Sequence, residues 1–111
     1  IVYGLRNFIG NANKFSRNTV YINLKSNNEI TEVTIEDDGP GFPRDVLSKI
    51  GEPYLSSDEY QEKSKTGLGL GLFIGKTLLE KNFASINCRN SKTRRGAEVI
   101  IRWKNKELFN I

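Results

Sequence analysis

Apolar residues recur at helical spacing at the start of the chain. Those that share one helix face are Val2, Leu5, Ile9 and Ala12. This spacing predicts an amphipathic helix. The opposite face is polar at positions i, i+4 and i+7, which are Asn7, Asn11 and Lys14. Asparagine suits a helix interior poorly, because its side chain competes for backbone hydrogen bonds. This polar face is therefore either a solvated surface or a functional one.

An alternation of apolar and polar residues follows, which is typical of β-strands. It covers residues 20–25 and 30–36, on either side of the turn signal at residues 27–28. We expect a β-hairpin with one buried face. The residues expected on that face are Val20, Ile22, Leu24, Val33 and Ile35.

The second half of the chain predicts a long loop, a helix and two strands. A chain break over residues 37–41 precedes a predicted short helix over residues 45–50. Residues 52–66 are polar and have no clear period, which predicts a mobile surface loop. A helix of apolar period then begins near Leu70, and two strands close the chain. These strands are expected at residues 84–89 and 98–104.

The order of these elements is helix, hairpin, loop, helix, hairpin. Strands paired in hairpins with helices set apart indicate an α+β fold. We expect a two-layer sandwich, with helices on one face of a mixed, mostly antiparallel sheet. A length of 111 residues favours one domain, residues 1–111.

Composition excludes several kinds of chemistry. The chain has no histidine, which excludes Ser-His catalysis, histidine metal sites and a phosphohistidine within it. A single cysteine, Cys88, excludes an intrachain disulfide and suggests a reducing compartment. No apolar run approaches the ~18 residues of a membrane span. The net charge of +4 indicates either a solvated surface with a mild basic excess or a site for an anionic ligand. No long basic stripe interleaved with aromatics points to nucleic acid.

Two glycine-rich stretches at element boundaries suggest phosphate binding. A dinucleotide fingerprint fails, because its third glycine would stand at Leu72 and a polar loop precedes the motif. Gly75-Lys76-Thr77 matches the end of a P-loop, but the first glycine of that motif would stand at Leu70. We interpret these three residues as part of a core helix.

Three segments together resemble the ATP-binding domain shared by sensor histidine kinases, gyrase, Hsp90 and MutL. Residues 7–15 look like the N box, residues 37–41 like the G1 box D-x-G-x-G, and residues 67–72 like the G2 box G-x-G-L-G-L. The resemblance covers nearly the whole chain. It implies the GHKL (Bergerat) type of two-layer sandwich, with a flexible ATP lid over residues 52–66. Domains of this family open with a strand, so we expect this chain to be a fragment that lacks its first strand.

A finer resemblance concerns residues 51–54 and 69–80, which look like the redox-responsive sensor kinases of alphaproteobacteria, the RegB/PrrB/ActS type. Arg95-Gly96-Ala97 also fits that group. Most histidine kinases carry threonine in the place of Ala97, where its hydroxyl helps to hold adenine through water. Ala97 removes that contact.

The resemblance assigns the base of the nucleotide to the G1 box. Asp37 is expected to accept a hydrogen bond from the adenine amino group, because a carboxylate selects a base that offers a donor. Gly39 and Gly41 let the backbone pass close under the base. Phe15 is expected to cover the adenine face. An Asx-type turn remains the alternative for Asp37, and a plain core position the alternative for Phe15.

The same resemblance assigns the metal and catalysis to the N box. Asn11 is the expected Mg²⁺ ligand, and Asn7 is expected to orient the shell of the metal. Lys14 is placed to meet a phosphate. Asn7 stands where the gyrase and Hsp90 branch carries a catalytic glutamate. An amide cannot serve as that base, which favours transfer to another acceptor over hydrolysis.

The remaining nucleotide contacts are expected from the lid and the helix that follows it. Free N–H groups at a helix start suit triphosphate oxygens. The expected residues there are Thr66, Gly67, Leu68, Gly69, Leu70, Gly71 and Leu72. Lys63 and Lys65 are either contacts of the γ-phosphate or solvated loop residues. Tyr54 is expected to anchor the base of the lid.

The resemblance implies the ATP-binding catalytic domain of a two-component sensor histidine kinase. Such a domain presents the γ-phosphate of Mg-ATP to a histidine on a separate dimerisation domain, from which it passes to a response regulator receiver domain. We expect no nucleic-acid partner and no membrane contact by this fragment. We expect a cytoplasmic location, within a homodimeric parent kinase anchored in the bacterial inner membrane. The alternatives are a degenerate nucleotide-binding module used for protein–protein contact and a serine kinase of the anti-sigma-factor type.

Overall fold

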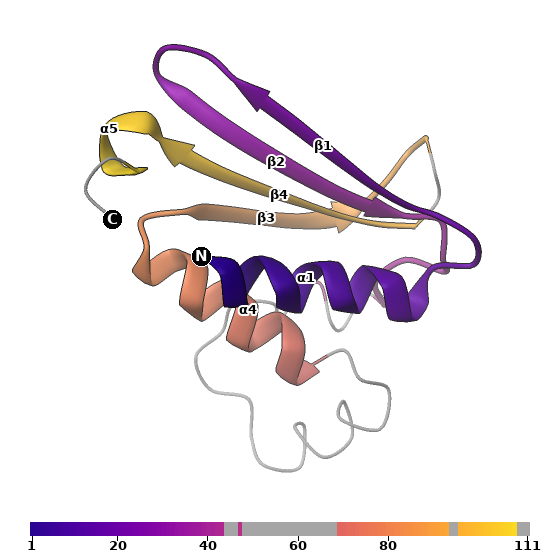
Figure 1. The fold of residues 1–111 in the computed structure, drawn as a ribbon. Helices are drawn as coiled ribbons and strands as arrows, with labels where there is room; N and C mark the ends of the chain where they lie inside the picture. The colour runs from indigo at the N-terminus through magenta and orange to yellow at the C-terminus, as the bar shows by residue number, and fades with distance from the viewer. Residues whose placement is uncertain (44–46, 48–68, 94–95, 109–111) are drawn as a thin grey trace.

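The computed structural model describes residues 1–43, 47, 69–93 and 96–108, and these form two layers (Figure 1). One layer is a sheet with strand order β1-β2-β4-β3, in which each neighbouring pair is antiparallel. Its strands are β1 Val20–Ser26, β2 Ile30–Asp37, β3 Ser85–Asn90 and β4 Ala97–Lys104. The predicted α+β sandwich is confirmed.

The other layer holds α1, Val2–Phe15, and α4, Gly69–Lys81, which lie on the same face of the sheet (Figure 1). A short helix, α5, Asn105–Leu108, follows β4 and was not predicted. Of the helix predicted over residues 45–50, only Leu47 is described, and it is helical. The predicted lid over residues 52–66 lies outside the described residues. None of the helices within the described ranges is long and apolar enough to span a membrane.

The core lies between the two layers. The period of two along β2 and β4 directs one set of side chains toward the helices. The sheet contributes Ile35, Val99, Ile101 and Trp103, and the helices contribute Phe8, Ala12, Leu72 and Leu79. Because α1 packs chiefly against β2 and α4 packs against β3, the helix layer covers the middle and one side of the sheet.

Two glycines set how closely α1 approaches α4. Gly4 of α1 is buried against Leu79, and a Cβ placed on it would lie 2.5 Å from Leu79 Cγ. Gly75 of α4 is buried against Phe8, with a notional Cβ 2.9 Å from the ring. Gly75 therefore lies in mid-helix at a helix crossing, as expected for a core helix and unlike a P-loop.

Strand β1 departs from the predicted buried face. The register pairs Ile22 with Ile35 and Leu24 with Val33, so these side chains share the side that faces the helices. Ile22 and Leu24 are nevertheless 56% and 66% exposed. The reason is position, because β1 is the edge strand and the helix layer ends before it.

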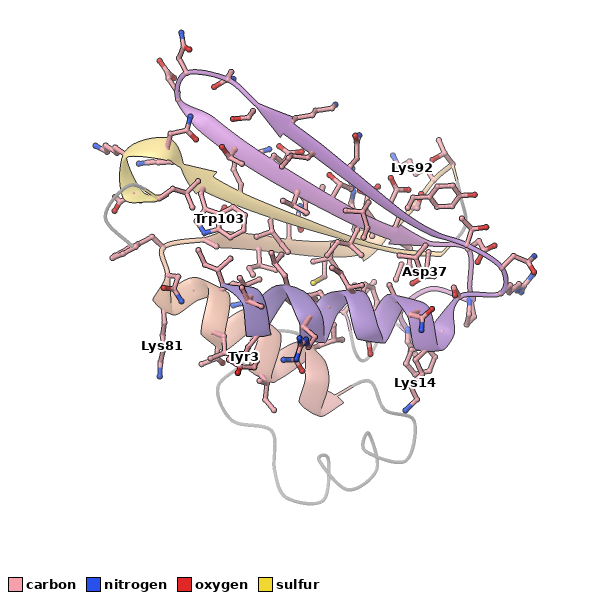
Figure 2. All side chains as sticks on the ribbon, in the orientation of Figure 1. Tyr3, Lys14, Asp37, Lys81, Lys92 and Trp103 are labelled. Carbon is pink, nitrogen blue, oxygen red and sulfur yellow. The ribbon has the colours of Figure 1, made fainter. Side chains whose placement is uncertain are left out.

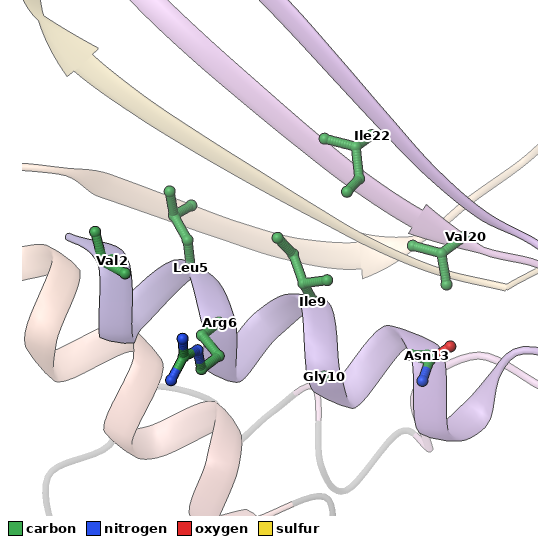
Figure 3. A pocket seen from close by; sticks show the side chains of 8 residues that line it. All are labelled: Val2, Leu5, Arg6, Ile9, Gly10, Asn13, Val20 and Ile22. Atoms are coloured by element: carbon green, nitrogen blue, oxygen red, sulfur yellow. The ribbon is translucent and has the colours of Figure 1, made fainter.

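An open groove of about 590 Å³ results between α1 and β1 (Figure 3). Figure 3 shows Val20 and Ile22 on β1 facing Leu5 and Ile9 on α1. Its other lining residues are Val2, Arg6, Gly10 and Asn13. The groove is mainly apolar, and among the described residues β1 has a neighbouring strand on one side only. An edge strand bordered by apolar side chains is a surface that proteins normally cover.

The two helical glycines of α1 predict opposite effects of the same substitution. Gly4→Ala should lower the free energy of unfolding by about 1–3 kcal/mol, because the new methyl group enters the space of a fully buried leucine. Gly10→Ala is the matched control, since a Cβ there meets nothing within 4 Å. It should raise stability by up to ~1 kcal/mol through helix propensity. Urea unfolding of both variants measures this, and equal effects would contradict the packing account.

Candidate nucleotide-binding site

A pocket of about 300 Å³ opens beside the end of α1 and the end of β2. Its lining residues are Asn11, Phe15, Asp37, Pro40, Gly41, Phe42, Pro43 and Ala97. Asn11, Phe15, Asp37 and Gly41 are four of the residues predicted for the nucleotide site. The fold thus brings part of the N box and part of the G1 box to one cavity, together with the start of β4.

Asp37 is the buried carboxylate of this pocket. It is 2% exposed, and its Oδ1 accepts hydrogen bonds from Gly39 N at 2.9 Å and Ala97 N at 3.2 Å. Within the described chain no group donates to its Oδ2. One oxygen therefore closes the Asx-type turn and ties β2 to β4, and the other remains as an acceptor. Asp37 can therefore form an Asx-type turn and still offer an acceptor to a base, so these two interpretations are compatible.

Both glycines of the G1 box are required by close approach. A Cβ on Gly39 would collide with the carbonyl oxygen of Phe15. Gly41 has φ +83, and a Cβ on it would lie 2.7 Å from Asn90 Oδ1. A side chain at either position would push the loop away from its neighbours, because neither has space for a Cβ. At Gly41 the left-handed backbone conformation also favours glycine.

Asn90, at the end of β3, holds this loop and was not predicted from the sequence. Its Oδ1 accepts a hydrogen bond from Phe42 N at 2.7 Å, and its Nδ2 donates to Phe42 O at 3.1 Å. The amide thus pairs with both backbone groups of a residue that lines the pocket. The only sequence signal was an asparagine before a turn, which predicts turn chemistry and nothing more.

Asp38 faces a different segment from Asp37. Its Oδ1 accepts hydrogen bonds from the backbone N–H groups of Arg17, Asn18 and Thr19, at 2.8, 3.1 and 3.3 Å. These donors, that of Asn18 first, hold the pKa of the Asp38 carboxyl below its ordinary value. The carboxylate is therefore charged at neutral pH, and it clamps the chain that leaves α1.

The predicted residues of α1 take different positions. Asn11 lines the pocket, whereas Asn7 and Lys14 do not. Asn7 Nδ2 donates to Tyr3 O at 2.8 Å, which leaves its oxygen for other partners. Lys14 is exposed, with Nζ 5.7 Å from the centre of the Phe15 ring. Figure 2 shows Lys14 pointing away from the sheet, while Asp37 lies between the sheet and α1.

The predicted phosphate residues are described only in part. Gly69, Leu70 and Gly71 lie in the first turn of α4. Leu72 is 3% exposed within the core, so a ligand can meet only its backbone. The other predicted contacts, Tyr54, Lys63, Lys65, Thr66, Gly67 and Leu68, lie outside the described residues.

The lone cysteine is separate from the pocket. Burial raises the pKa of the Cys88 thiol to about 12, although the charge of Lys76 works in the opposite direction. Cys88 is therefore a neutral thiol at physiological pH, on a strand that faces the core. The part of the chain that the structure describes also holds no cluster of three or more His, Cys, Asp or Glu side chains that could bind a metal by itself.

Comparison with known families shows which family the chain belongs to. The family described as histidine kinase-, DNA gyrase B-, and HSP90-like ATPase matches residues 1–107. The chain belongs to this ATPase family. The match includes all the described residues of the pocket, and it agrees with the resemblance that the N, G1 and G2 boxes carry in the sequence.

Relatives within the family are sensor kinases. The chain is 38% identical over 96 residues to the sensor histidine kinase RegB of Cereibacter sphaeroides, an alignment that covers 82% of the chain and 21% of RegB. It is 26% identical over 87 residues to the sensor histidine kinase CpxA of Escherichia coli, covering 78% of the chain and 19% of CpxA. The chain thus spans about a fifth of the length of these relatives.

Solved structures of the family share the fold. The mycobacterial sensor histidine kinase MprB superimposes with a TM-score of 0.69 at 23% identity, covering 92% of this chain and 70% of that one. Full-length ShkA in complex with AMPPNP gives a TM-score of 0.65 at 26% identity, covering 91% of this chain and 20% of that one. These likenesses agree with the two layers described above.

Proposed function

We propose that the pocket at the end of α1 and β2 binds the adenine base of ATP. The observation that carries this proposal is the buried Asp37 carboxylate, which keeps one oxygen for a donor on the wall of the pocket. Adenine offers an amino group as that donor, whereas guanine offers an acceptor at the same place. Phe15 and Phe42 supply apolar surface against which a flat base can pack.

The phosphates are proposed to lie along α1, toward the start of α4. Asn11, on the pocket wall, has an amide oxygen of the kind that Mg²⁺ accepts. Because the described residues offer no acidic cluster for a metal, this donor set fits an ion that arrives with the nucleotide and keeps phosphate and water oxygens. Bound there, Mg²⁺ would neutralise charge on the phosphates. Asn7 would orient the water around it, and Lys14 would add positive charge.

The domain is proposed to transfer the γ-phosphate and not to hydrolyse ATP. Asn7 has an amide where a water-activating base would be needed, and an amide takes up no proton at neutral pH. The acceptor is proposed to be a histidine on a dimerisation domain of the same homodimeric kinase, with a response regulator receiver domain downstream. The relatives RegB and CpxA support this proposal. A cytoplasmic position within a membrane-anchored parent belongs to the same proposal.

Substitution of Asp37 tests the base-binding role. Asp37→Ala should weaken ATP binding by about 10–100-fold, because an adenine donor left unpaired in a partly desolvated site costs ~1–3 kcal/mol. It should also remove the preference for ATP over GTP. Asn11→Ala is the comparison variant, and it should weaken binding mainly when Mg²⁺ is present. Calorimetric titration measures both, and a folded Asp37→Ala that keeps affinity and preference would refute the assignment.

A phosphotransfer assay separates the kinase from its alternatives. With γ-labelled ATP, acid-labile label should appear on an added histidine-bearing dimerisation domain of the parent and none on this chain, which has no histidine. Label on serine would favour the anti-sigma-factor type of kinase. Nucleotide binding without transfer to any acceptor would favour a degenerate module.

The groove between α1 and β1 supports a further part of the proposal, on domain organisation. We propose that in the longer protein an added strand preceding Ile1 lies along the outer side of β1 and covers Ile22 and Leu24. Val2, at the start of α1, lines the same groove, so a segment joined to it begins beside β1. An apolar groove next to the outer strand of a sheet suits a strand with alternating apolar side chains.

A charge placed in the groove tests this coverage. In the present chain Ile22→Asp should change the free energy of unfolding by less than about 0.5 kcal/mol, because Ile22 is largely exposed. In a chain extended upstream the same change should cost about 1–3 kcal/mol, because the carboxylate would then be buried. Asn23→Asp, on the opposite face of β1, is the control. Equal costs of Ile22→Asp in the two chains would show that no added segment covers the groove.

A further inference from the structure

Two neighbouring carboxylates of the G1 box bind different parts of the molecule. Asp37 bonds to its own turn and to Ala97 of β4. Asp38 instead reaches back along the chain by about twenty residues, to the three consecutive N–H groups of Arg17, Asn18 and Thr19. Successive residues at the end of a strand point to opposite sides, which explains the division.

The Asp38 clamp acts at the point where α1 ends. Phe15 is the last residue of α1, and its carbonyl oxygen packs against Gly39 so closely that no side chain fits there. The clamped N–H groups follow two residues later. Ser16, between them, is already extended, with ψ 149, so the helix does not continue into the clamp. The exit of α1 is therefore fixed to the G1 box by one packing contact and one charged acceptor.

The C-terminal end of α1 supplies the residues on one side of the pocket. Phe15 lines the pocket directly, and Asn11 lines it one helical turn earlier. Asp37 lies on the other side, at the end of β2. Helix α1 is attached at its other end by the contact between Gly4 and Leu79. Between these ends Phe8 and Ala12 pack in the core, so Asn11 and Phe15 lie on the part of α1 that is nearest to the segment held by Asp38.

We propose that Asp38 is a positioning residue of the nucleotide site. It sets the distance between Asn11 on α1, which is assigned to the metal, and the carboxylate of Asp37, which is assigned to the base. Asp38 contacts no nucleotide in this proposal. It acts through the backbone of residues 17–19. The inference rests on the proposed function, because it assigns Asn11 and Asp37 to the two ends of one nucleotide.

A matched clamp elsewhere in the fold separates positioning from stability. Asn27 also accepts two backbone N–H groups through Oδ1, those of Glu29 and Ile30, each at 2.8 Å. It lies in the turn between β1 and β2, at the end of that hairpin opposite to Asp37. Asn27→Ala therefore removes a clamp of the same kind that has no connection to the pocket.

The experiment measures nucleotide binding by Asp38→Ala, Asp38→Asn and Asn27→Ala. Asp38→Ala should weaken Mg-ATP binding by about 10-fold, because the charge-assisted hydrogen bonds that hold the backbone of residues 17–19 are lost. It should keep the preference for ATP over GTP, because the bonds of Asp37 remain. Asp38→Asn keeps an oxygen where all three donors converge, so it should recover most of the affinity, to within ~3-fold of the starting chain. Asn27→Ala should leave binding unchanged.

The outcomes distinguish the two proposals. Amide NMR signals of residues 14–19 should move in Asp38→Ala and not in Asn27→Ala. If they move and Mg-ATP binding stays at the level of the unsubstituted chain, Asp38 has no positioning role and the proposed function stands. If Asn27→Ala weakens binding as much, the effect is one of stability and the positioning role is again refuted.

If Asp38→Ala does not fold, Asp38→Asn serves as the test variant, since full loss of affinity in that folded variant contradicts the clamp. Absence of ATP binding by the unsubstituted chain overturns the proposed function itself.

Discussion

The pocket depends on two adjacent carboxylates that gather backbone N–H groups from three segments. Asp37 binds the turn after β2 and the start of β4, and Asp38 binds the chain that leaves α1. Backbone N–H groups in a loop need partners, and a carboxylate offers several lone pairs at one point. The consequence is that the end of β2 becomes the junction at which the helix layer and the sheet are held in register.

Close backbone approach is the second requirement of this junction. Gly39 lets the carbonyl of Phe15 reach the loop, and Gly41 lets Asn90 pair with Phe42. The same device brings α1 and α4 together, where Gly4 and Gly75 leave room for Leu79 and Phe8. Glycine thus serves close packing at two distinct places, and only at Gly41 does it also serve a positive φ.

One wall of the pocket is part of the packed interior of the domain. Asp37, Phe42 and Ala97 on this wall are all buried. Side chains that are already held by packing lose little conformational freedom when a ligand binds. In the proposed function this wall receives the base. The exposed apolar residues of β1, Ile22 and Leu24, lie outside this pocket, and we propose that they are covered by another segment of the longer protein.

The sequence by itself determined the order of the four strands and the two long helices, and half of the residues that line the pocket. The period of two in β2 and the helical period of α1 follow from local geometry. The G1 box was identified because it stands in order with two other boxes of the same family resemblance. Tertiary structure alone decided three things. Ile22 is exposed because β1 is the edge strand, which a period of two cannot reveal. Asn90 holds Phe42 from 48 residues away, and Asp38 holds Arg17 from 21 residues away. Such pairings arise when the sheet brings distant segments together, and no spacing along the chain encodes them.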